Sequence, residues 1–518
     1  MDRRRVLLLA ASVAVVSLPF LPNLMTSPED PVGMEMPEPA VRGDSDAYQG
    51  VWHHWWMARA VSRGLDPRFC PLVYHPRGAS LVFDSVGWVD CLLLAPLSMA
   101  SPVLSYNIGL LLNSLLALAG VGLLARSLGA GRGAALAAGL MAAWLPARTA
   151  HLVQHYQVAA VGWTALALAM AVGAARSRRS GPFVSGLLAL FAALALLESP
   201  YHFLILLAGV VLLPILAGRG VGLRGLLAAG IPAVTGGLLG LAFLLSGPGD
   251  PGSPSLPWRE AIYWSAEPQA FLMPSPFGLA GRLLGMPASA PWMPNPFEGV
   301  VTPGITVLAA AIVGSAARHR WRLASAAGLL FLLALGPQLK VFGHLTPIPL
   351  PYRLVGMLPG LGGARAASRF ALLGGMLLAV AAGRTIMSLR GWKRTALAAL
   401  VALELLPPGL PSVDGGFPGE YRDLRGMGPV LELPATGQAR RYLYLQTVDG
   451  NPRYVTFLAR PPAWAEGYVR RVDSLVLASG SPEELAESAG AAAVVEGHWL
   501  VEAAVEDSVS VYCTGAGP

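Results

Sequence analysis

Long apolar runs, separated by short segments that contain arginine, constrain the fold of this chain more than any other feature. Runs such as 102–125, 183–197 and 225–246 approach or exceed the ~20 apolar residues that a helix needs to cross a ~30 Å hydrocarbon layer. The chain is 54% hydrophobic and only 13% charged, a composition that excludes an ordinary water-soluble protein. The sequence therefore predicts an all-α polytopic membrane protein.

The basic residues predict which loops face the cytoplasm, because cytoplasmic loops of membrane proteins carry an excess of Arg and Lys. They cluster near residues 3–5, 126–132, 176–179, 219–224, 318–322 and 384–394. Placing these clusters on one side gives about eleven spans, near 6–24, 102–125, 133–147, 157–175, 182–197, 201–217, 225–246, 302–317, 323–339, 368–389 and 395–408. The odd number places the N-terminus inside and the tail outside. The first run also resembles a signal peptide, but no small-x-small cleavage site follows it, so we expect a retained anchor.

Three long outer loops follow from this topology, near 28–100, 247–301 and 340–367. Loops longer than about fifteen residues are uncommon unless they are functional or disordered, so their gathering on one face indicates a built cavity. The run 85–100 is too short to span the membrane and carries Asp90, and we expect a helix in the outer interface there.

The predicted domains are a transmembrane domain, 1–409, and an extracytoplasmic domain, 410–518. The tail lacks long apolar runs, and the segments 430–433, 442–447 and 453–458 are typical of short strands. We therefore expect a small α/β domain outside the membrane.

Several functional classes are disfavoured by the sequence. The net charge of +7 is divided among short loops and forms no basic face, so we expect no nucleic-acid partner. No P-loop, His-Glu-x-x-His or Cys-x-x-Cys motif is present, which argues against ATP-driven transport and zinc proteolysis. Cys70, Cys91 and Cys513 follow no recognised spacing, so a disulfide among them stays open and we expect unpaired thiols.

The first outer loop carries the residues best suited to chemistry. Ser45 can cap a helix that begins at Asp46, and Asp44 precedes it. An aromatic and basic stripe suited to the headgroup level follows on this helix, at Trp52, Trp55, Trp56, Arg59 and Arg63. Asp46 and His53 share another face. A carboxylate here can act as a general base for a hydroxyl or hold a divalent metal against phosphates; the alternative is that both acids only cap a turn.

Two further groups of polar residues lie at outer helix ends. Glu198, with His202, interrupts an apolar run, and an acid within a membrane segment costs roughly 2.5–3.5 kcal/mol on insertion scales, so it is rarely idle. A plain turn is the alternative explanation. Arg148 and His151, with His155 nearby, end another span.

Arg365 and Arg369 break the positive-inside pattern. A guanidinium fork suits a phosphate or pyrophosphate. The alternative is that these arginines pair with Glu267 or Glu298.

The order of several short motifs resembles the bacterial polytopic GT-C-type glycosyltransferases. In the first loop these are Asp46 through Trp56, then Gly64-Leu65-Asp66-Pro67, then Tyr74-His75-Pro76-Arg77-Gly78. Similar segments follow at 148–154, 264–276, 298–304, 365–370, 430–434 and 450–453. Glu267 stands where the commoner pattern has Asp, and Asp44-Ser45-Asp46 has two acids where one usually suffices.

This resemblance implies a GT-C-like enzyme that moves a sugar, with inversion, from a polyprenyl-phosphate donor to an acceptor glycan, lipid or protein. It also implies location in the bacterial inner membrane, in contact with its lipids. The catalytic carboxylate would be Asp46, with Asp44 as the second choice, and both would be ligands if a divalent cation (Mg or Mn) is needed. Substrate-binding residues would be Glu198, His202, Arg148, His151, Glu267, Arg365 and Arg369.

Two other functions stay open. One is a transporter or flippase of a lipid or small solute, although the ionisable groups lie at outer helix ends rather than at mid-bilayer. The other is a non-catalytic scaffold with a GT-C-like fold, because fold does not fix function.

Overall fold

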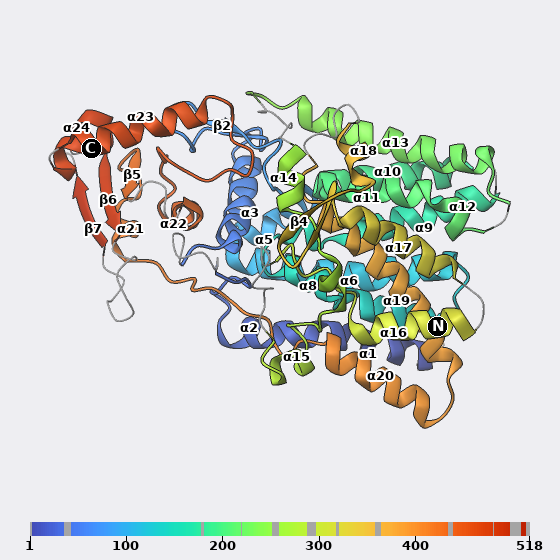
Figure 1. Ribbon diagram of the computed structural model, residues 1–518. Helices are drawn as coiled ribbons and strands as arrows, with labels where there is room; N and C mark the ends of the chain where they lie inside the picture. Colours follow the sequence, from blue (N-terminus) through green and yellow to red (C-terminus); the bar gives the residue numbers. More distant parts are fainter. Residues whose placement is uncertain are drawn as a thin grey trace. The chain divides into compact units, whose positions relative to one another are not determined.

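A computed structural model gives the fold of the chain (Figure 1). It describes residues 3–35, 43–177, 181–218, 220–250, 258–286, 297–317, 321–357, 364–433, 439–479, 481–497 and 509–513. The chain divides into two compact units. The first comprises Met1–Pro22, Leu110–Ala242 and Pro254–Leu410, and the second comprises Asn23–Gly109, Phe243–Ser253 and Pro411–Pro518.

Each of the ranges predicted to span the membrane contains a helix. These helices are α1 (Arg3–Ser17), α6 (Pro102–Ser127), α7 (Arg132–Ala143), α9 (Val161–Ser177), α10 (Pro182–Glu198), α11 (Pro200–Val211), α13 (Leu223–Leu245), α16 (Ile305–Ala317), α17 (Arg322–Ala334), α19 (Phe370–Ser388) and α20 (Trp392–Leu405). Within the described residues, 5 helical segments are long and apolar enough to cross a membrane: Leu7–Thr26, Pro102–Ser127, Tyr156–Ser177, Leu223–Leu245 and Ala367–Ser388. The chain is therefore a multi-pass membrane protein, and the number of eleven spans stays a prediction.

Helix α19 is the central helix of the first unit. Nearly all of its residues are buried, and it packs against α7, α16 and α17. Glycine makes the close approach to α7 possible, because a Cβ at Gly383 would lie 2.6 Å from the carbonyl oxygen of Ala134. The rigid packing of α19 fixes the position of Arg369, which directly precedes it.

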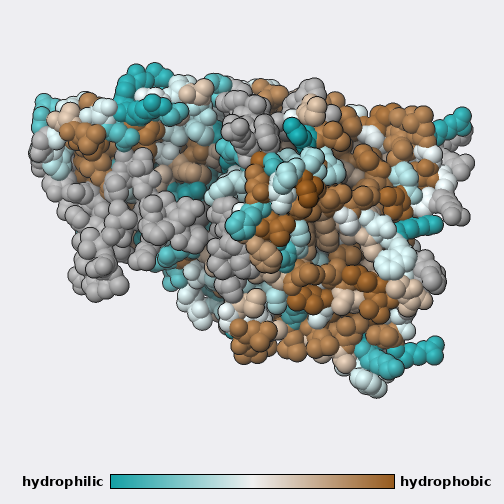
Figure 2. Space-filling view, in the orientation of Figure 1, coloured by the Kyte–Doolittle hydropathy of each residue, from teal (hydrophilic) through white to brown (hydrophobic). Residues whose placement is uncertain are grey.

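The outer surface of the first unit is rich in apolar side chains (Figure 2). Four apolar residues there are more than half exposed: Leu238 and Leu239 of α13, Val313 of α16 and Leu400 of α20. In water such a surface would be unfavourable, whereas in a bilayer the lipid chains cover it.

Short elements connect the helices of the first unit. They are α8 (Pro146–Leu152), η3 (Tyr156–Ala159), α12 (Leu213–Leu216), α14 (Trp258–Tyr263), η4 (Pro268–Leu272), α15 (Leu279–Leu283), the antiparallel strands β3 (Gln338–Val341) and β4 (His344–Pro349), α18 (Tyr352–Gly356) and η5 (Ala367–Arg369). The 3-10 helix η1 (Leu18–Phe20) follows α1 and leads into α2 (Leu21–Thr26).

The second unit combines helices with small sheets. Its first-loop elements are α3 (Asp46–Ser62), β1 (Phe69–Cys70), β2 (Ala79–Ser80), α4 (Trp88–Leu93) and α5 (Ala95–Ser98), and its tail contains α21 (Glu420–Asp423), β5 (Val430–Leu433), α22 (Ala439–Asp449), α23 (Ala465–Ala478), α24 (Pro482–Ala489), β6 (Ala493–Gly497) and β7 (Val509–Cys513). In the tail, β6 pairs in parallel with β5 and antiparallel with β7. Leu431, Tyr454, Val472, Leu485 and Val494 form its apolar core.

The strand predictions for the tail are confirmed only in part. The strand at 430–433 is present, but 442–447 lies within helix α22 and the prediction there is wrong. In 453–458 only Arg453 makes an isolated bridge, to Val430, so that strand is also wrong. Alternating aromatic and aliphatic residues at 442–447 have strand propensity, and packing of the segment against α3 overrides it.

Helices α3 and α22 pack along their length. The indole N–H of Trp52 donates to Gln446 Oε1 at 2.7 Å, and the rings of Tyr48 and Tyr444 lie 5.1 Å apart. Trp52 and Trp56 are buried within the second unit and do not lie at the headgroup level. They hold the loop together instead.

The structure describes the side chains of two cysteines. Cys70 and Cys91 are buried thiols without a disulfide, and the side chain of Cys513 lies outside the described part of the chain.

Candidate functional site

Two clusters of acids and arginines, one in each unit, contain four of the predicted site residues: Asp44, Asp46, His151 and Arg369. In the second unit, Ser45 caps α3 as expected, because its Oγ accepts the backbone N–H of Ala47 at 3.2 Å. This cap fixes Asp44 just before the helix and Asp46 in its first turn, where the helix dipole favours a negative charge.

Arg440 lies between these two acids. Its Nη1 is 2.9 Å from Asp44 Oδ2, and its Nε is 2.7 Å from Asp46 Oδ1. The guanidinium also stacks on Phe457, 3.7 Å from the ring centroid. One arginine therefore contacts both predicted catalytic carboxylates.

Asp44 and Asp46 differ in their surroundings. Asp44 Oδ1 also accepts the backbone N–H of Arg441 at 3.0 Å, so Asp44 caps the first turn of α22. Burial raises the pKa of Asp44, against the opposing effect of Arg440. The side chain of Asp44 is only 2% exposed, whereas that of Asp46 is 13% exposed. Asp46 is therefore the more accessible carboxylate.

A second polar group lies further along α3. His53 Nε2 is 2.7 Å from Asp84 Oδ2, and Gln49 Nε2 donates to both oxygens of Asp84. The backbone N–H of Ala459 donates to Asp84 Oδ1 at 2.6 Å. All these side chains are buried, so Asp84 ties α3 to the tail and is a structural residue.

The cluster in the first unit is built around Glu298, which precedes α16. Its Oε1 accepts from Nε and Nη2 of Arg369, at 2.9 and 2.6 Å, and its Oε2 accepts from the hydroxyl of Ser368 at 2.6 Å. The carboxylate thus contacts the side chains of two consecutive residues of η5, directly before α19. Of the open alternatives, pairing of Arg369 with Glu298 is confirmed.

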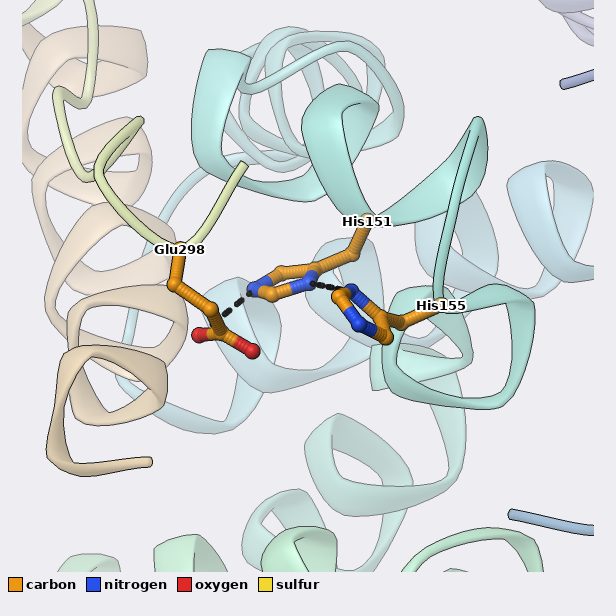
Figure 3. A group of neighbouring side chains, drawn as sticks. All are labelled: His151, His155 and Glu298. Carbon is orange, nitrogen blue, oxygen red and sulfur yellow. Dashed lines mark hydrogen bonds and ion pairs between the residues drawn. The ribbon is translucent and has the colours of Figure 1, made fainter. Parts of the chain in front are cut away.

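His151 lies between Glu298 and His155 (Figure 3). His151 Nε2 is 3.8 Å from Glu298 Oε2, and its Nδ1 is 3.4 Å from Nδ1 of His155. Burial lowers the pKa of His151 to about 3, so the imidazole is neutral at pH 7. Burial opposes ionisation of Glu298, but the guanidinium of Arg369 outweighs it and holds the pKa of this carboxyl below its usual range.

These three residues can hold a metal ion. One ligand atom from each lies within 4.8 Å of the others, and neutral imidazole and ionised carboxylate are the protonation states that metals require. The donor set suits Zn or a similar transition metal better than Mg, which prefers oxygen ligands. The predicted metal ligands Asp44 and Asp46, by contrast, are paired with Arg440.

Tyr201, three residues after Glu198, also contacts this cluster. The guanidinium of Arg369 lies 4.3 Å from the ring centroid of Tyr201, whose hydroxyl accepts the backbone N–H of Ala366 at 3.0 Å. His202 is fully buried, with Nε2 3.1 Å from the carbonyl oxygen of Gln157. Glu198 is the last residue of α10 and is also fully buried.

The remaining predicted residues have partners elsewhere in the first unit. Glu267 Oε2 accepts the backbone N–H of Gly343 at 2.9 Å, in the turn between β3 and β4. Arg365 pairs with Glu260 at 3.5 Å and stacks on Trp264, so pairing with Glu267 or Glu298 is not what occurs. Arg148 is buried and donates to the carbonyl oxygens of Ala143 and Ala159 and to Ser114 Oγ, which gives it a structural role.

Sequence reasoning missed several members of both clusters. Glu298 and His155 lay in recognised segments but were not predicted as site residues. Tyr201 lies three residues after Glu198, the last residue of α10. An aromatic residue close to an acid at a helix end is the sequence signal that could have identified Tyr201 as a site residue. Nothing in the sequence signals Arg440, because it is 396 residues away from Asp44.

Comparisons with known proteins identify the type of fold. No family model matches this sequence, and no curated protein matches it. Among solved structures, the oligosaccharyltransferase of Archaeoglobus fulgidus in the apo form is similar, with a TM-score of 0.55 and 14% sequence identity over 95% of this chain and 69% of that one. The fold is of the GT-C type.

Two other structures are similar at lower scores. The same archaeal enzyme in complex with an inhibitory peptide and a dolichol-phosphate has a TM-score of 0.48 at 13% identity, over 96% of this chain and 69% of that one. The mycobacterial arabinofuranosyltransferase AftD, mutant R1389S, has a TM-score of 0.49 at 16% identity, and this chain covers only 37% of its length. At such identities the likeness concerns the fold alone.

Proposed function

We propose that this protein is a membrane glycosyltransferase that moves a sugar from a polyprenyl-phosphate donor to an acceptor outside the bacterial inner membrane. The observation that carries the proposal is the partly exposed carboxylate of Asp46, fixed by a helix cap and an arginine in a chain with the GT-C fold. A general base needs such a combination of fixed orientation and access.

Asp46 would take the proton from an acceptor hydroxyl. The hydroxyl oxygen would then attack the anomeric carbon, the bond from that carbon to the phosphate oxygen would break, and polyprenyl phosphate would leave. A single displacement of this kind inverts the anomeric configuration. Asp44, which is buried and caps α22, would position Asp46 and Arg440 rather than react.

The Glu298 cluster would serve the donor. Arg369 provides a guanidinium, the group that binds phosphate most specifically, and Glu298 and Tyr201 hold it in one orientation. His151, His155 and Glu298 would hold a divalent cation, which would supply positive charge for a phosphate oxygen. The two clusters belong to different units, so each role is proposed and tested separately.

The test uses the purified full-length protein in lipid nanodiscs and a panel of radiolabelled polyprenyl-phosphate sugars, with and without Zn²⁺ or Mn²⁺. Release of water-soluble sugar reports hydrolysis or transfer. We expect activity in the wild type and a loss of about 10²–10⁴-fold in Asp46→Asn, the range for removal of a general base. The matched control is Asp66→Asn, an acid of the same loop that pairs locally with Arg68; it should keep activity.

Full activity of a folded Asp46→Asn variant would reject Asp46 as the base. No turnover of any donor by the wild type, with donor binding intact, would favour the transporter or the non-catalytic scaffold. An activity that disappears with His151→Ala and returns with excess cation would support the cation-binding role of the first-unit cluster.

A further inference from the structure

The position of Arg440 between Asp44 and Asp46 determines whether this acid pair can hold a metal ion. Its Nη1 and Nε each contact one carboxylate, at 2.9 and 2.7 Å. These contacts use two different edges of the fork, so a single cation joins both acids. A divalent cation bound by both acids would occupy the same place.

The surroundings hold Arg440 firmly in this place. Its guanidinium lies 3.7 Å from the ring centroid of Phe457, and stacking on an aromatic face suits a planar guanidinium better than a compact ion. Its neighbour Arg441 donates a backbone N–H to Asp44 at 3.0 Å, and Arg441 Nη1 lies 2.8 Å from the Tyr48 hydroxyl. Arg440 and Arg441, near the start of α22, therefore both contact Asp44 and the first turn of α3.

We propose that Arg440 is a built-in counter-cation, which takes the place of a divalent metal at the Asp44–Asp46 pair and orients Asp46. The residues do not fit the metal site that the sequence predicts there, because the tail already supplies the positive charge. Arg440 is a positioning residue, since it acts through Asp46. Its positioning role rests on the proposed function, whereas its occupation of the cation position does not.

The proposal predicts that removing Arg440 creates a metal site. In Arg440→Ala, the guanidinium that joins the two carboxylates would be absent, and we expect Mn²⁺ to bind there with a dissociation constant of ~0.1–1 mM, as at sites with few carboxylates. The wild type should show no Mn²⁺ site that depends on Asp46. Electron paramagnetic resonance of free Mn²⁺, titrated against the full-length protein in nanodiscs, measures this directly.

Matched variants assign the signal. Arg440→Ala with Asp46→Asn should lose the new site, which separates it from Mn²⁺ held by the His151 cluster. Arg422→Ala removes an exposed arginine that stacks on Phe417 and has no acid partner among the residues that the structure describes, and it should gain no site. Arg440→Lys keeps the charge and should also gain none.

Two outcomes would overturn the proposal. One is a wild-type Mn²⁺ site that disappears in Asp46→Asn, since the pair would then bind metal with Arg440 present. The other is a folded Arg440→Ala variant with no additional site. If Arg440→Ala does not fold, the wild-type and Asp46→Asn titrations still decide, because they need no change at Arg440.

An activity measurement tests the positioning role separately. In Arg440→Ala we expect slower sugar release, partly restored by Mn²⁺, whereas the wild type should not respond through Asp46. Restoration by a metal is not expected if Arg440 only stabilises the fold. If the wild type is inactive with every donor, the proposed function fails, but the binding titrations still test whether Arg440 holds the cation position.

Discussion

The second unit contains two clusters that each combine one arginine with two acids but have different surroundings. In one, Arg440 contacts Asp44 and Asp46; in the other, Arg453 contacts Glu432 at 2.9 Å and Asp449 at 2.5 Å. The side chains of Arg453, Glu432 and Asp449 are at most 2% exposed, whereas those of Arg440 and Asp46 are 16% and 13% exposed. The two clusters therefore differ in access to solvent, and the predictions below test whether this difference separates a functional cluster from a structural one.

The Arg453 cluster joins parts of the tail. Glu432 lies on β5 and Asp449 ends α22, and the Tyr421 hydroxyl donates to Glu432 at 3.3 Å. Burial raises the pKa of Glu432 to about 8, against the opposing effect of Arg453. With two acids around one arginine, the cluster keeps a proton on Glu432 at pH 7.

The largest expected difference between the clusters concerns activity. Asp46→Asn should reduce sugar transfer about 10²–10⁴-fold, whereas Asp449→Asn should leave the activity of the folded fraction near that of the wild type. The reason is that Asp46 is accessible and Asp449 is fully buried against Arg453. Initial rates per folded protein, after size-exclusion chromatography, measure this.

If Asp449→Asn reduced the rate per folded molecule as much as Asp46→Asn, exposure would not separate the clusters. Equal and full activity of both variants would remove Asp46 from the mechanism while leaving the fold unaffected.

The effects on stability should have the opposite order: a substitution in the buried Arg453 cluster should destabilise the protein more than one in the Arg440 cluster. Arg453→Ala leaves two buried acids without their arginine, and breaking a buried pair costs about 3–5 kcal/mol. Arg440→Ala should cost less, because Arg440 and Asp46 are partly hydrated. Thermal unfolding of the nanodisc-embedded variants, followed by near-ultraviolet circular dichroism, compares them.

A smaller loss for Arg453→Ala than for Arg440→Ala would contradict the assignment. Arg453→Met serves as the control for volume, because it keeps the bulk of the side chain and removes only the charge.

The pH dependence of stability should follow Glu432. Its folded-state pKa of about 8 is raised above the ordinary value of 4.5, so the folded tail binds a proton that the unfolded tail releases. This contribution is fully present below the ordinary value and is lost as pH rises through about 8, by at most ~1.4 kcal/mol per pH unit. Unfolding midpoints measured from pH 5 to 9 should fall, and Glu432→Gln should flatten the curve.

A midpoint that rises over this range, or a curve that Glu432→Gln leaves unchanged, would show that Glu432 is ionised in the folded state. Asp44 should contribute with the same sign, because burial raises its pKa too.

Local rules in the sequence predicted much of this architecture. The apolar runs predicted the helices of the first unit, and Ser45 predicted the start of α3 at Asp46. These features depend on neighbouring residues, so a single sequence contains them. The likeness to GT-C-type proteins was likewise recognised from the order of short motifs and is confirmed at the level of the fold.

Partners distant in the chain could not be predicted. The sequence identifies Asp46 and Arg369 as unusual, but it left Arg369 with two possible acids and gave Asp46 no arginine. Packing of α22 against α3 brings Arg440 to the acid pair, and this packing also made 442–447 a helix where strand propensity predicted otherwise. Tertiary contacts determine both the partner of Asp46 and the helix at 442–447, and a single sequence does not show these contacts.

The smallest expected effect on stability concerns an exposed ion pair of the tail. Arg470 and Glu466 pair on the surface of α23, with side chains 72% and 77% exposed. Exposed pairs one helical turn apart contribute about 0.3–0.5 kcal/mol, because water screens both charges. Arg470→Ala should therefore shift the unfolding midpoint far less than Arg440→Ala, and added salt should remove what difference remains. If Arg470→Ala destabilised the protein as much as Arg440→Ala, exposure would not order these pairs, and the partial burial of the Asp44–Asp46–Arg440 cluster would no longer set it apart from an ordinary surface pair.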